Sequence, residues 1–313
     1  MPSAADGELL VRTAYASICG SDLHSVFGDA PPRPGIPGYP GHESVGEVVE
    51  SRCPGFEPGD RVLTVPHFAD GRCMAEYQAL PGSACIKLPA TAPLSHLLMA
   101  QQLGTVVFAL RCRPLDLVGK DAAVIGQGSA GAFFTFLLKR AGAARVLVSD
   151  KSPARLAYSR QLGADIAVDA APVDAGTVAA GNGGFRSAVL EATGGQGAGL
   201  VVEAVGSRET FPLSVDLAAS GATVLWFGLP EGADDYPFSF HGFFRRRLTA
   251  YSTWDAQGEP GLVSFRYAVR LIADGAIDVA PLLSHMLPID QVDQAFRIAH
   301  ERTGNALKVS VKF

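Results

Sequence analysis

The chain has 313 residues, of which 48% are hydrophobic and 18% are charged, and its formal net charge is -5. This length exceeds what one hydrophobic core usually serves, so we expect two domains. Basic residues are scattered apart from Arg245, Arg246 and Arg247, a triplet that is typical of a solvated face. A nucleic-acid partner is therefore not expected, because it would need a basic stripe or a strongly basic domain.

The N-terminus and the cysteines indicate the cellular compartment. No basic residues precede an apolar run at the N-terminus, so a secretory signal is not expected. No stretch of about 18 uncharged apolar residues occurs, so no membrane span is expected. The five cysteines are widely spaced, which argues against a disulfide framework and against a four-cysteine zinc lobe. These features together predict a cytoplasmic protein.

Roughly the first hundred residues predict short strands separated by turns. Strand formers recur over Glu8–Ala16, Glu43–Ser51, Gly59–Val65 and Ala75–Leu80. The segment 29–41 is dense in proline and glycine, which predicts a loop. Many short strands with such loops indicate a β-rich, barrel-like domain.

The pattern changes near Pro93, where helical and strand segments begin to alternate. This alternation indicates βαβ units and a doubly wound parallel sheet. The glycine-rich stretch Ala180–Gly184 is expected to be a loop. The expected elements are helix Ser95–Arg111, strand Asp121–Ile125, helix Ala130–Ala141, strand Arg145–Ser149, helix Pro153–Leu162, strands Ile166–Asp169, Leu200–Ala204 and Ala222–Phe227, helices Val263–Asp274 and Ile289–Arg302, and strand Ala306–Phe313.

The segment 126–131, Gly-Gln-Gly-Ser-Ala-Gly, matches the dinucleotide-binding pattern G-x-G-x-x-G. A buried strand leads into it, a helix leaves it, and the next strand ends on an acidic residue about 20 positions later, as this motif requires. The glycines allow a tight turn, close approach of a pyrophosphate and close packing of the helix, whose N-terminus attracts phosphates. The residues expected to contact the cofactor are Gly126, Gly128, Ser129, Ala130, Gly131 and Asp150.

Asp150 also indicates which dinucleotide is bound. A carboxylate at this position accepts hydrogen bonds from the ribose hydroxyls and repels a 2′-phosphate, which favours NAD over NADP. Lys151 and Arg155 lie nearby and are cations of the kind that can receive a 2′-phosphate. NAD is therefore the predicted cofactor and NADP the alternative.

A second group of reactive residues lies upstream, in Ile18-Cys-Gly-Ser-Asp-Leu-His24 and Gly41-His-Glu43. Thiolate and imidazole are preferred zinc ligands, and catalytic zinc sites use three protein ligands with one open position. At these residues the sequence resembles the zinc-dependent medium-chain alcohol and polyol dehydrogenases. The resemblance covers nearly the whole chain and includes the glycine loop and the closing Gly304–Val309 segment.

The resemblance implies a zinc site. Cys19 and His42 fall on two ligands of the catalytic zinc, and Glu43 falls on a neighbouring carboxylate that is a ligand or a supporting group. Asp22 would orient a ligand histidine. Gln101 occupies the position of the third ligand, where relatives carry Cys, Glu or Asp. Either Glu43 or Gln101 would then complete the site, or zinc would be weak or absent.

The resemblance also implies the chemistry. Ser21 and His24 fall on the groups that carry the alcohol proton to solvent, while Thr105 and Lys308 fall on positions that contact the cofactor. Zinc would act as a Lewis acid while a hydride passes between a secondary alcohol or polyol and NAD. Two alternatives stay open: a zinc-free NADPH-dependent reductase of the same superfamily, and a non-catalytic nucleotide-binding relative.

The implied fold class is α/β, with a Rossmann doubly wound parallel sheet domain over 99–255 and a β-rich GroES-like catalytic domain over 1–98 and 256–313. Two departures from the family are the missing structural zinc lobe and the missing N-terminal hairpin. The second would leave a sheet edge for a partner subunit to cover. A homodimer or homotetramer is expected.

Overall fold

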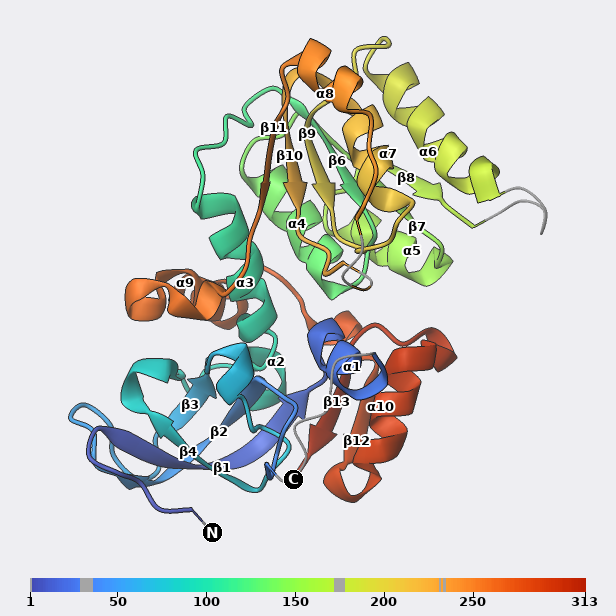
Figure 1. Cartoon of the computed structure of the whole chain (residues 1–313). Helices are drawn as coiled ribbons and strands as arrows, with labels where there is room; N and C mark the ends of the chain where they lie inside the picture. The colour runs from blue at the N-terminus through green and yellow to red at the C-terminus, as the bar shows by residue number, and fades with distance from the viewer. Residues whose placement is uncertain (1, 29–35, 172–177, 231, 233–234) are drawn as a thin grey trace. The chain divides into compact units, whose positions relative to one another are not determined.

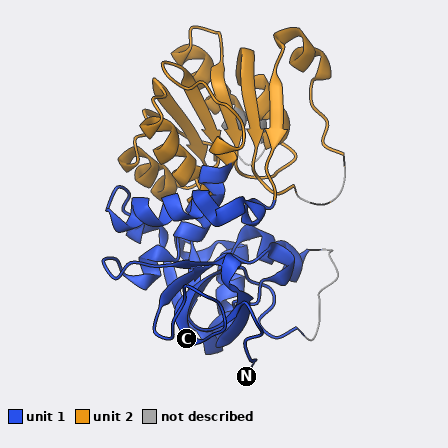
Figure 2. Ribbon diagram, turned by 90° about the vertical axis from the view of Figure 1, so that its left-hand side faces the viewer, with its two compact units in different colours: residues 1–108, 255–313 blue, residues 109–254 orange. Residues whose placement is uncertain are grey.

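The computed structural model describes the chain except residues 1, 29–35, 172–177, 231 and 233–234. The chain forms two compact units: unit 1 comprises residues 1–108 and 255–313, and unit 2 comprises residues 109–254 (Figure 2). The domain limits expected from the sequence, 98/99 and 255/256, stay predictions. Within the described ranges, no helix is long and apolar enough to cross a membrane.

The elements follow one another along the chain as labelled in Figure 1. The strands are β1 Glu8–Ser17, β2 Glu43–Ser51, β3 Arg61–Thr64, β4 Tyr77–Pro81, β5 Cys85–Lys87, β6 Asp121–Ile125, β7 Arg145–Asp150, β8 Ile166–Asp169, β9 Ala198–Glu203, β10 Ala218–Trp226, β11 Thr249–Ser252, β12 His285–Pro288 and β13 Val309–Lys312. The α-helices are α1 Gly20–Phe27, α2 Leu94–Leu97, α3 Ala100–Arg111, α4 Ser129–Arg140, α5 Pro153–Gln161, α6 Val178–Ala192, α7 Thr210–Asp216, α8 Phe240–Arg246, α9 Val263–Ala273 and α10 Val292–Glu301. Short 3-10 helices cover Phe68–Asp70, Gly82–Ala84, Ala256–Gly258, Pro260–Leu262, Ala280–Leu282, Ile289–Gln291 and Thr303–Asn305.

Unit 1 is built on a seven-stranded sheet in the order β12-β13-β1-β2-β3-β5, with β4 also paired to β1. The pairs formed by β1 are antiparallel: β2 pairs along most of its length, while β4 pairs with its first half and β13 with its last three residues. Leu9 and Val11 point into one core cluster with Val48 and Val62. The β-rich domain expected from the sequence is confirmed.

Unit 2 is built on a six-stranded parallel sheet in the order β11-β10-β9-β6-β7-β8. Helices α4 and α5 pack together against β6, β7 and β8, and α6 and α7 pack together against the sheet as well. The two helix pairs cover opposite faces of the sheet (Figure 1). The doubly wound α/β fold expected from the alternation of elements is confirmed.

One expected loop is a helix. The glycine-rich stretch Ala180–Gly184 lies within α6, which spans Val178–Ala192. Glycine disfavours a helix by about 1 kcal/mol per residue relative to alanine. The second half of α6 offsets this cost because Phe185 and Val189 are fully buried against the core of unit 2. The loop prediction was wrong because packing overrode local propensity.

The position of Gly183 inside α6 predicts that Gly183→Ala stabilises unit 2. Gly183 lies inside α6 and a Cβ there would meet no atom within 4 Å, so the helix gains propensity without a clash. We expect a gain of roughly 0.5–1 kcal/mol, seen as a higher unfolding midpoint of unit 2 in calorimetry. Gly195→Ala is the matched control, because Gly195 has φ +82° and should lose stability. If both substitutions raised the unfolding midpoint, or both lowered it, the assignment of Gly183 to a helix would be contradicted.

Candidate functional site

The end of β1 and the start of β2 bring reactive side chains together in unit 1. Ser17, the last residue of β1, lies opposite Glu43, the first residue of β2. The chain then turns into α1, and the backbone N–H of Cys19 donates to Asp22 Oδ2 at 2.8 Å, which fixes the first helical turn. Strand register therefore places the Cys19 turn beside His42 and Glu43.

Three of the side chains that the sequence analysis assigned to zinc form one cluster. Ligand atoms of Cys19, His42 and Glu43 all lie within 4.8 Å of one another. His42 and Glu43 are buried, while Cys19 is half-buried. Sulfur, nitrogen and oxygen donors at this spacing could hold one metal ion.

His42 is oriented by a buried carboxylate. Its Nδ1 lies 3.2 Å from Asp22 Oδ1, and the Asp22 side chain is fully buried. Burial by itself lowers the pKa of His42, but the charge and hydrogen bonding of Asp22 more than offset this and raise the pKa well above its usual value. Contact through Nδ1 leaves Nε2 as the nitrogen available to a metal.

Glu43 is held by two donors on the same oxygen. The hydroxyl of Ser17 donates to Glu43 Oε2, and the ammonium of Lys308 lies 2.5 Å from that atom. Burial by itself raises the pKa of Glu43, but the positive charges of Lys308 and His42 outweigh it, so the pKa is lowered and the group is ionised. Glu43 Oε1 is buried and has no hydrogen-bond partner among the residues that the structure describes. This oxygen is free to act as a ligand.

The charges in this cluster fit a divalent cation. If Cys19 bound a metal as its thiolate and His42 as a neutral imidazole, the acidic groups of Cys19, Asp22 and Glu43 would exceed the single ammonium of Lys308 by two charges. Burying unbalanced charge is costly, so a site of this kind needs a compensating cation. One divalent ion bound by a neutral His42 balances the remaining two negative charges.

A glycine loop at the carboxyl end of β6 forms the second candidate site, in unit 2. Gly126 has φ +87°, a conformation that favours glycine, and makes the turn out of the strand. A Cβ on Gly131 would lie 1.9 Å from the carbonyl oxygen of Gly126, so α4 can begin this close only with glycine there. A Cβ on Gly128 would meet no atom within 4 Å, which leaves open space where a phosphate would approach.

Asp150 ends β7 beside this loop. The backbone N–H of Gln127 donates to Asp150 Oδ2 at 2.7 Å, and that of Ser152 donates to Oδ1 at 2.8 Å. Arg155, one of the two nearby cations of the kind that can receive the 2′-phosphate of NADP, lies 3.8 Å from Asp150 Oδ2. The carboxylate is therefore fixed at the position expected for a ribose-binding acid.

Comparison with known proteins identifies the family. Residues 5–91 match the model of the alcohol dehydrogenase GroES-like domain, and residues 131–273 match the model of the zinc-binding dehydrogenases. The chain belongs to the zinc-type medium-chain dehydrogenase/reductase family. It is an oxidoreductase of that family.

Relatives of this medium-chain dehydrogenase match it over nearly its full length. It is 28% identical to an L-threonine 3-dehydrogenase of Bacillus velezensis, over 99% of this chain and 92% of the relative. It is 27% identical to an L-threonine 3-dehydrogenase of Deinococcus deserti, over 95% of this chain and 89% of the relative. Its structure superposes on an alcohol dehydrogenase from Thermus sp. ATN1 with a TM-score of 0.83 and 25% identity, over 100% of this chain and 94% of the other.

The remaining predicted site residues of this dehydrogenase lie on two helices of unit 1. Ser21 and His24 are three positions apart on α1 and so share a face of the helix. Gln101 is buried in α3, and its Nε2 lacks a partner within the described part of the chain. Thr105 donates its hydroxyl to the Gln101 carbonyl at 3.2 Å.

Two contacts in the metal cluster could not be foreseen from sequence. Lys308 is a predicted cofactor contact, and the structure also places its buried ammonium against Glu43. Ser17 carried no motif, because its relevance comes from a strand register that places it opposite Glu43. A lysine that is 3% exposed implies a paired anion, yet burial of a single residue is not visible in the sequence.

Two glycine substitutions separate packing from ligand approach in the dinucleotide loop. Gly128→Ala should fold normally, because its Cβ enters open space, and should weaken NADH binding about tenfold by blocking a phosphate. Gly131→Ala should lower the melting temperature of the ligand-free protein, because its Cβ overlaps the Gly126 carbonyl. Calorimetry and fluorescence titration with NADH measure the two effects. Unchanged NADH affinity in Gly128→Ala would remove this loop from the binding site.

Proposed function

We propose that this medium-chain dehydrogenase transfers a hydride between NAD(H) and a secondary alcohol or polyol, or its ketone, and that one zinc ion binds at Cys19, His42 and Glu43. The cluster of these three side chains carries the proposal, because their sulfur, nitrogen and oxygen ligand atoms all lie within 4.8 Å of one another. The relatives named L-threonine 3-dehydrogenase support a substrate with a secondary hydroxyl group.

Glu43 rather than Gln101 is the proposed third ligand. Glu43 presents a buried oxygen with no hydrogen-bond partner among the described residues, on an ionised carboxylate, and Zn²⁺ is bound in proteins by Cys, His and carboxylate side chains rather than by neutral amides. Ser17 and Lys308 anchor the opposite oxygen, so the carboxylate would bind through Oε1 alone. Asp22 would keep the His42 ring oriented from behind.

The residues around the cluster have proposed roles in the reaction. Zinc bound there would supply Lewis acidity at the substrate oxygen. The Ser21 hydroxyl would receive the alcohol proton and His24 would pass it to solvent. Both side chains are on α1, next to Cys19, and are partly accessible.

NAD is the proposed cofactor. Asp150 is held by two backbone N–H groups and is placed to accept the ribose hydroxyls. Arg155 lies against Asp150, so its charge is partly compensated and less available to a 2′-phosphate. Gly126, Gly128, Ser129, Ala130 and Gly131 would receive the pyrophosphate; Thr105 and Lys308 remain predicted cofactor contacts.

The function predicts that zinc-loaded protein reduces NAD, and NADP more slowly, in the presence of secondary alcohols or polyols. Absorbance of the reduced nicotinamide over a substrate panel measures this. Removal of metal with a chelator should abolish the reaction, and added zinc should restore it. A full reaction rate in protein shown to be metal-free by elemental analysis would sink the zinc mechanism.

Matched variants identify the third ligand. The double variant Glu43→Gln with Lys308→Met removes a ligand without leaving an unpaired buried ammonium, and we expect zinc affinity to fall about tenfold or more. Gln101→Ala should leave zinc affinity unchanged. Competition with a colorimetric chelator measures both affinities. Loss of zinc in Gln101→Ala alone would assign the third ligand to Gln101 instead.

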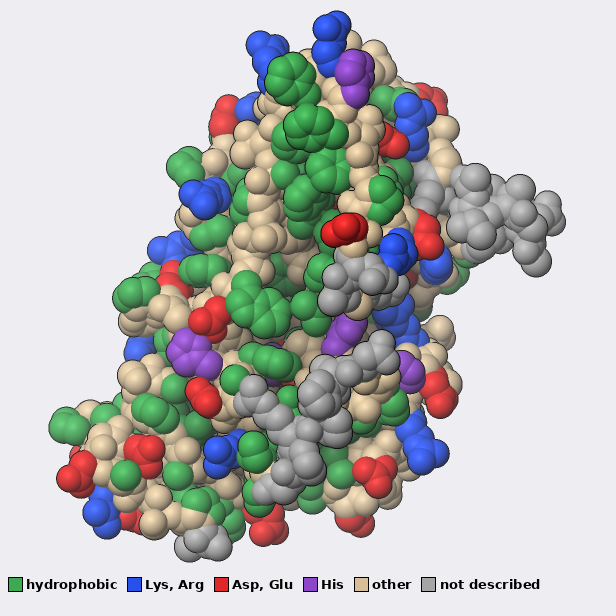
Figure 3. Space-filling model, in the orientation of Figure 1, with side chains coloured by type: hydrophobic (Ala, Val, Ile, Leu, Met, Phe, Trp, Pro, Cys, Tyr) green, Lys and Arg blue, Asp and Glu red, His purple; other side chains and the backbone are tan. Residues whose placement is uncertain are grey.

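We also propose that two copies associate through unit 2. Strand β11 lies at the end of the sheet and carries the uncharged sequence Thr-Ala-Tyr-Ser, which leaves a sheet edge suited to pairing with another strand. Helix α8 leads into this strand, and Phe240 and Phe244 on it are 68% and 70% exposed. Hydrophobic side chains gather over this part of unit 2 in Figure 3.

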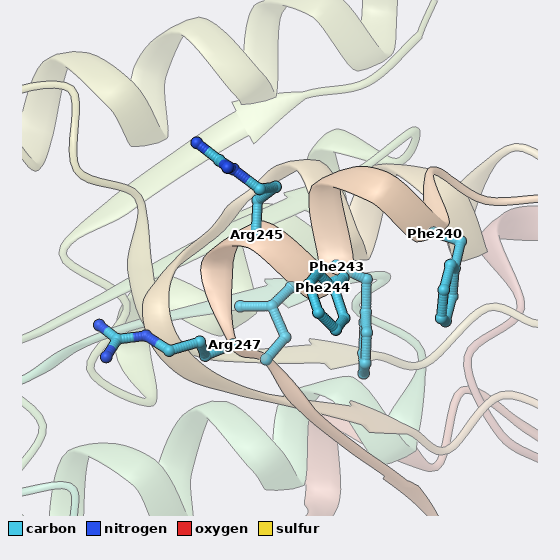
Figure 4. Close-up of a pocket in the computed structure, with 6 residues that line it drawn as sticks. Phe240, Phe243, Phe244, Arg245 and Arg247 are labelled. Atoms are coloured by element: carbon cyan, nitrogen blue, oxygen red, sulfur yellow. The ribbon is translucent and has the colours of Figure 1, made fainter.

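The aromatic surface of α8 has the composition of an interface core. Figure 4 shows the rings of Phe240, Phe243 and Phe244 extending from α8, with the side chains of Arg245 and Arg247 directed away from them. These residues and Leu248 line an open hollow of about 460 Å³. Aromatic residues bordered by arginine are enriched at protein interfaces, and a two-fold dimer would cover the same patch on both subunits.

The double variant Phe240→Ser with Phe244→Ser should convert the dimer to a monomer, because it removes apolar contact area that would otherwise be buried. Light scattering on a sizing column measures the mass. Val118→Ser is the control, since Val118 is 77% exposed and lies outside this patch. A variant that stays dimeric would show that α8 is not the interface, and a monomeric parent protein would remove the dimer proposal.

A further inference from the structure

A buried carboxyl group occupies the middle of the carboxyl edge of the sheet in unit 2. Glu203, the last residue of β9, is fully buried and lies in register between Ile125 at the end of β6 and Trp226 at the end of β10. No motif in the sequence marks it. Figure 1 shows β9, the strand that Glu203 ends, between β6 and β10.

Glu203 hydrogen-bonds to two of these turns. Its Oε1 accepts the backbone N–H groups of Val205 at 2.8 Å and Gly206 at 2.9 Å. Its own carbonyl oxygen accepts the N–H groups of Phe227 at 2.9 Å and Gly228 at 3.0 Å. One residue therefore fixes the turn after β9 and the turn after β10.

The two turns pack too closely to move independently. A Cβ on Gly206 would lie 2.0 Å from the Leu229 carbonyl oxygen, and a Cβ on Gly228 would lie 2.6 Å from Glu203 Oε2. The Val205 side chain covers the glycine loop, because a Cβ on Gly126 would lie 2.5 Å from Val205 Cγ2. A change at Glu203 would thus be transmitted to the surface on which a dinucleotide rests.

The order of strands indicates that these turns would contact the nicotinamide half of a bound dinucleotide. Asp150 follows β7, on one side of the glycine loop, and the Val205 and Gly228 turns follow β9 and β10, on the other side. A dinucleotide with its pyrophosphate at the loop and its adenosine at Asp150 must extend its nicotinamide riboside over these turns.

We propose that Glu203 is a positioning residue for the nicotinamide half of the cofactor, acting through the 204–206 and 227–229 turns. This inference rests on the proposed binding of a dinucleotide at Gly126–Gly131. Glu203 does not touch the ligand; it holds the backbone that does. The adenosine half depends on Asp150 and is independent of Glu203.

Binding of AMP and NADH by the full-length protein tests whether Glu203 affects the nicotinamide half of the cofactor and not the adenosine half. Glu203→Gln preserves volume, but its amide NH₂ would face the crowded turn at Gly206 and Gly228 in place of an oxygen. We expect about tenfold weaker NADH binding with unchanged AMP binding. Asp150→Asn should weaken both ligands, and Glu191→Gln, an exposed position on α6, should weaken neither.

A second variant covers the case in which Glu203→Gln does not fold. Val205→Ala keeps both hydrogen bonds to Glu203 and changes a side chain that is 39% exposed, so the fold should survive. It should also weaken NADH and spare AMP. Equal weakening of AMP and NADH, or unchanged NADH affinity in both variants, would overturn the role of Glu203. A parent protein that binds neither ligand would instead refute the dinucleotide site itself, and the inference with it.

Discussion

The ion pair between Glu43 and Lys308 is the interaction on which the chemistry of unit 1 depends. Both side chains are almost fully buried, and removing one partner of such a pair typically costs about 3–5 kcal/mol. The pair joins the start of β2 to the residue before β13, and Ser17 of β1 donates to the same oxygen. The pairing of β13 with β1 therefore brings the ammonium that stabilises the buried Glu43 carboxylate to the start of β2.

Unit 2 orients its acidic groups by a different means. Asp150 and Glu203 each accept two backbone N–H groups, and the cation near Asp150, Arg155, lies 3.8 Å away, whereas the ammonium of Lys308 lies 2.5 Å from Glu43. Backbone donors keep a carboxylate in place without neutralising it, so Asp150 can still receive hydroxyl groups from a ligand. In unit 1 the lysine reduces the charge of the cluster to what one divalent ion can balance.

Most of the fold could be predicted from the sequence, because hydrophobic periodicity and turn residues are local signals. The strand, glycine loop and helix from Asp121 to Arg140 agree with the structure almost residue for residue. The expected helix Ser95–Arg111 is instead divided into α2 and α3, and Ala180–Gly184 is helical. These differences arise where contacts distant in sequence decide between local alternatives.

In the candidate sites, the motif residues could be predicted from the sequence, but the residues that contact them could not. Cys19, His42 and Glu43 stand in recognisable motifs, and the structure places their ligand atoms close together. The partners that set their charge, Lys308 and Ser17, depend on strand register and on burial, which the sequence does not display. Glu203 was missed for the same reason, because its importance arises from two turns that meet only in the folded sheet.

The side chain of Gln127 has a consequence for the thermodynamics of ligand binding. It is turned inward and buried; its Nε2 donates to the Gly126 carbonyl, and its Oε1 accepts from Thr135 on α4 and Ser159 on α5. The loop is thereby fixed to two helices before any ligand arrives. Association then requires little loss of conformational entropy in the protein, so more of the contact energy appears as affinity, and encounter need not wait for the loop to rearrange.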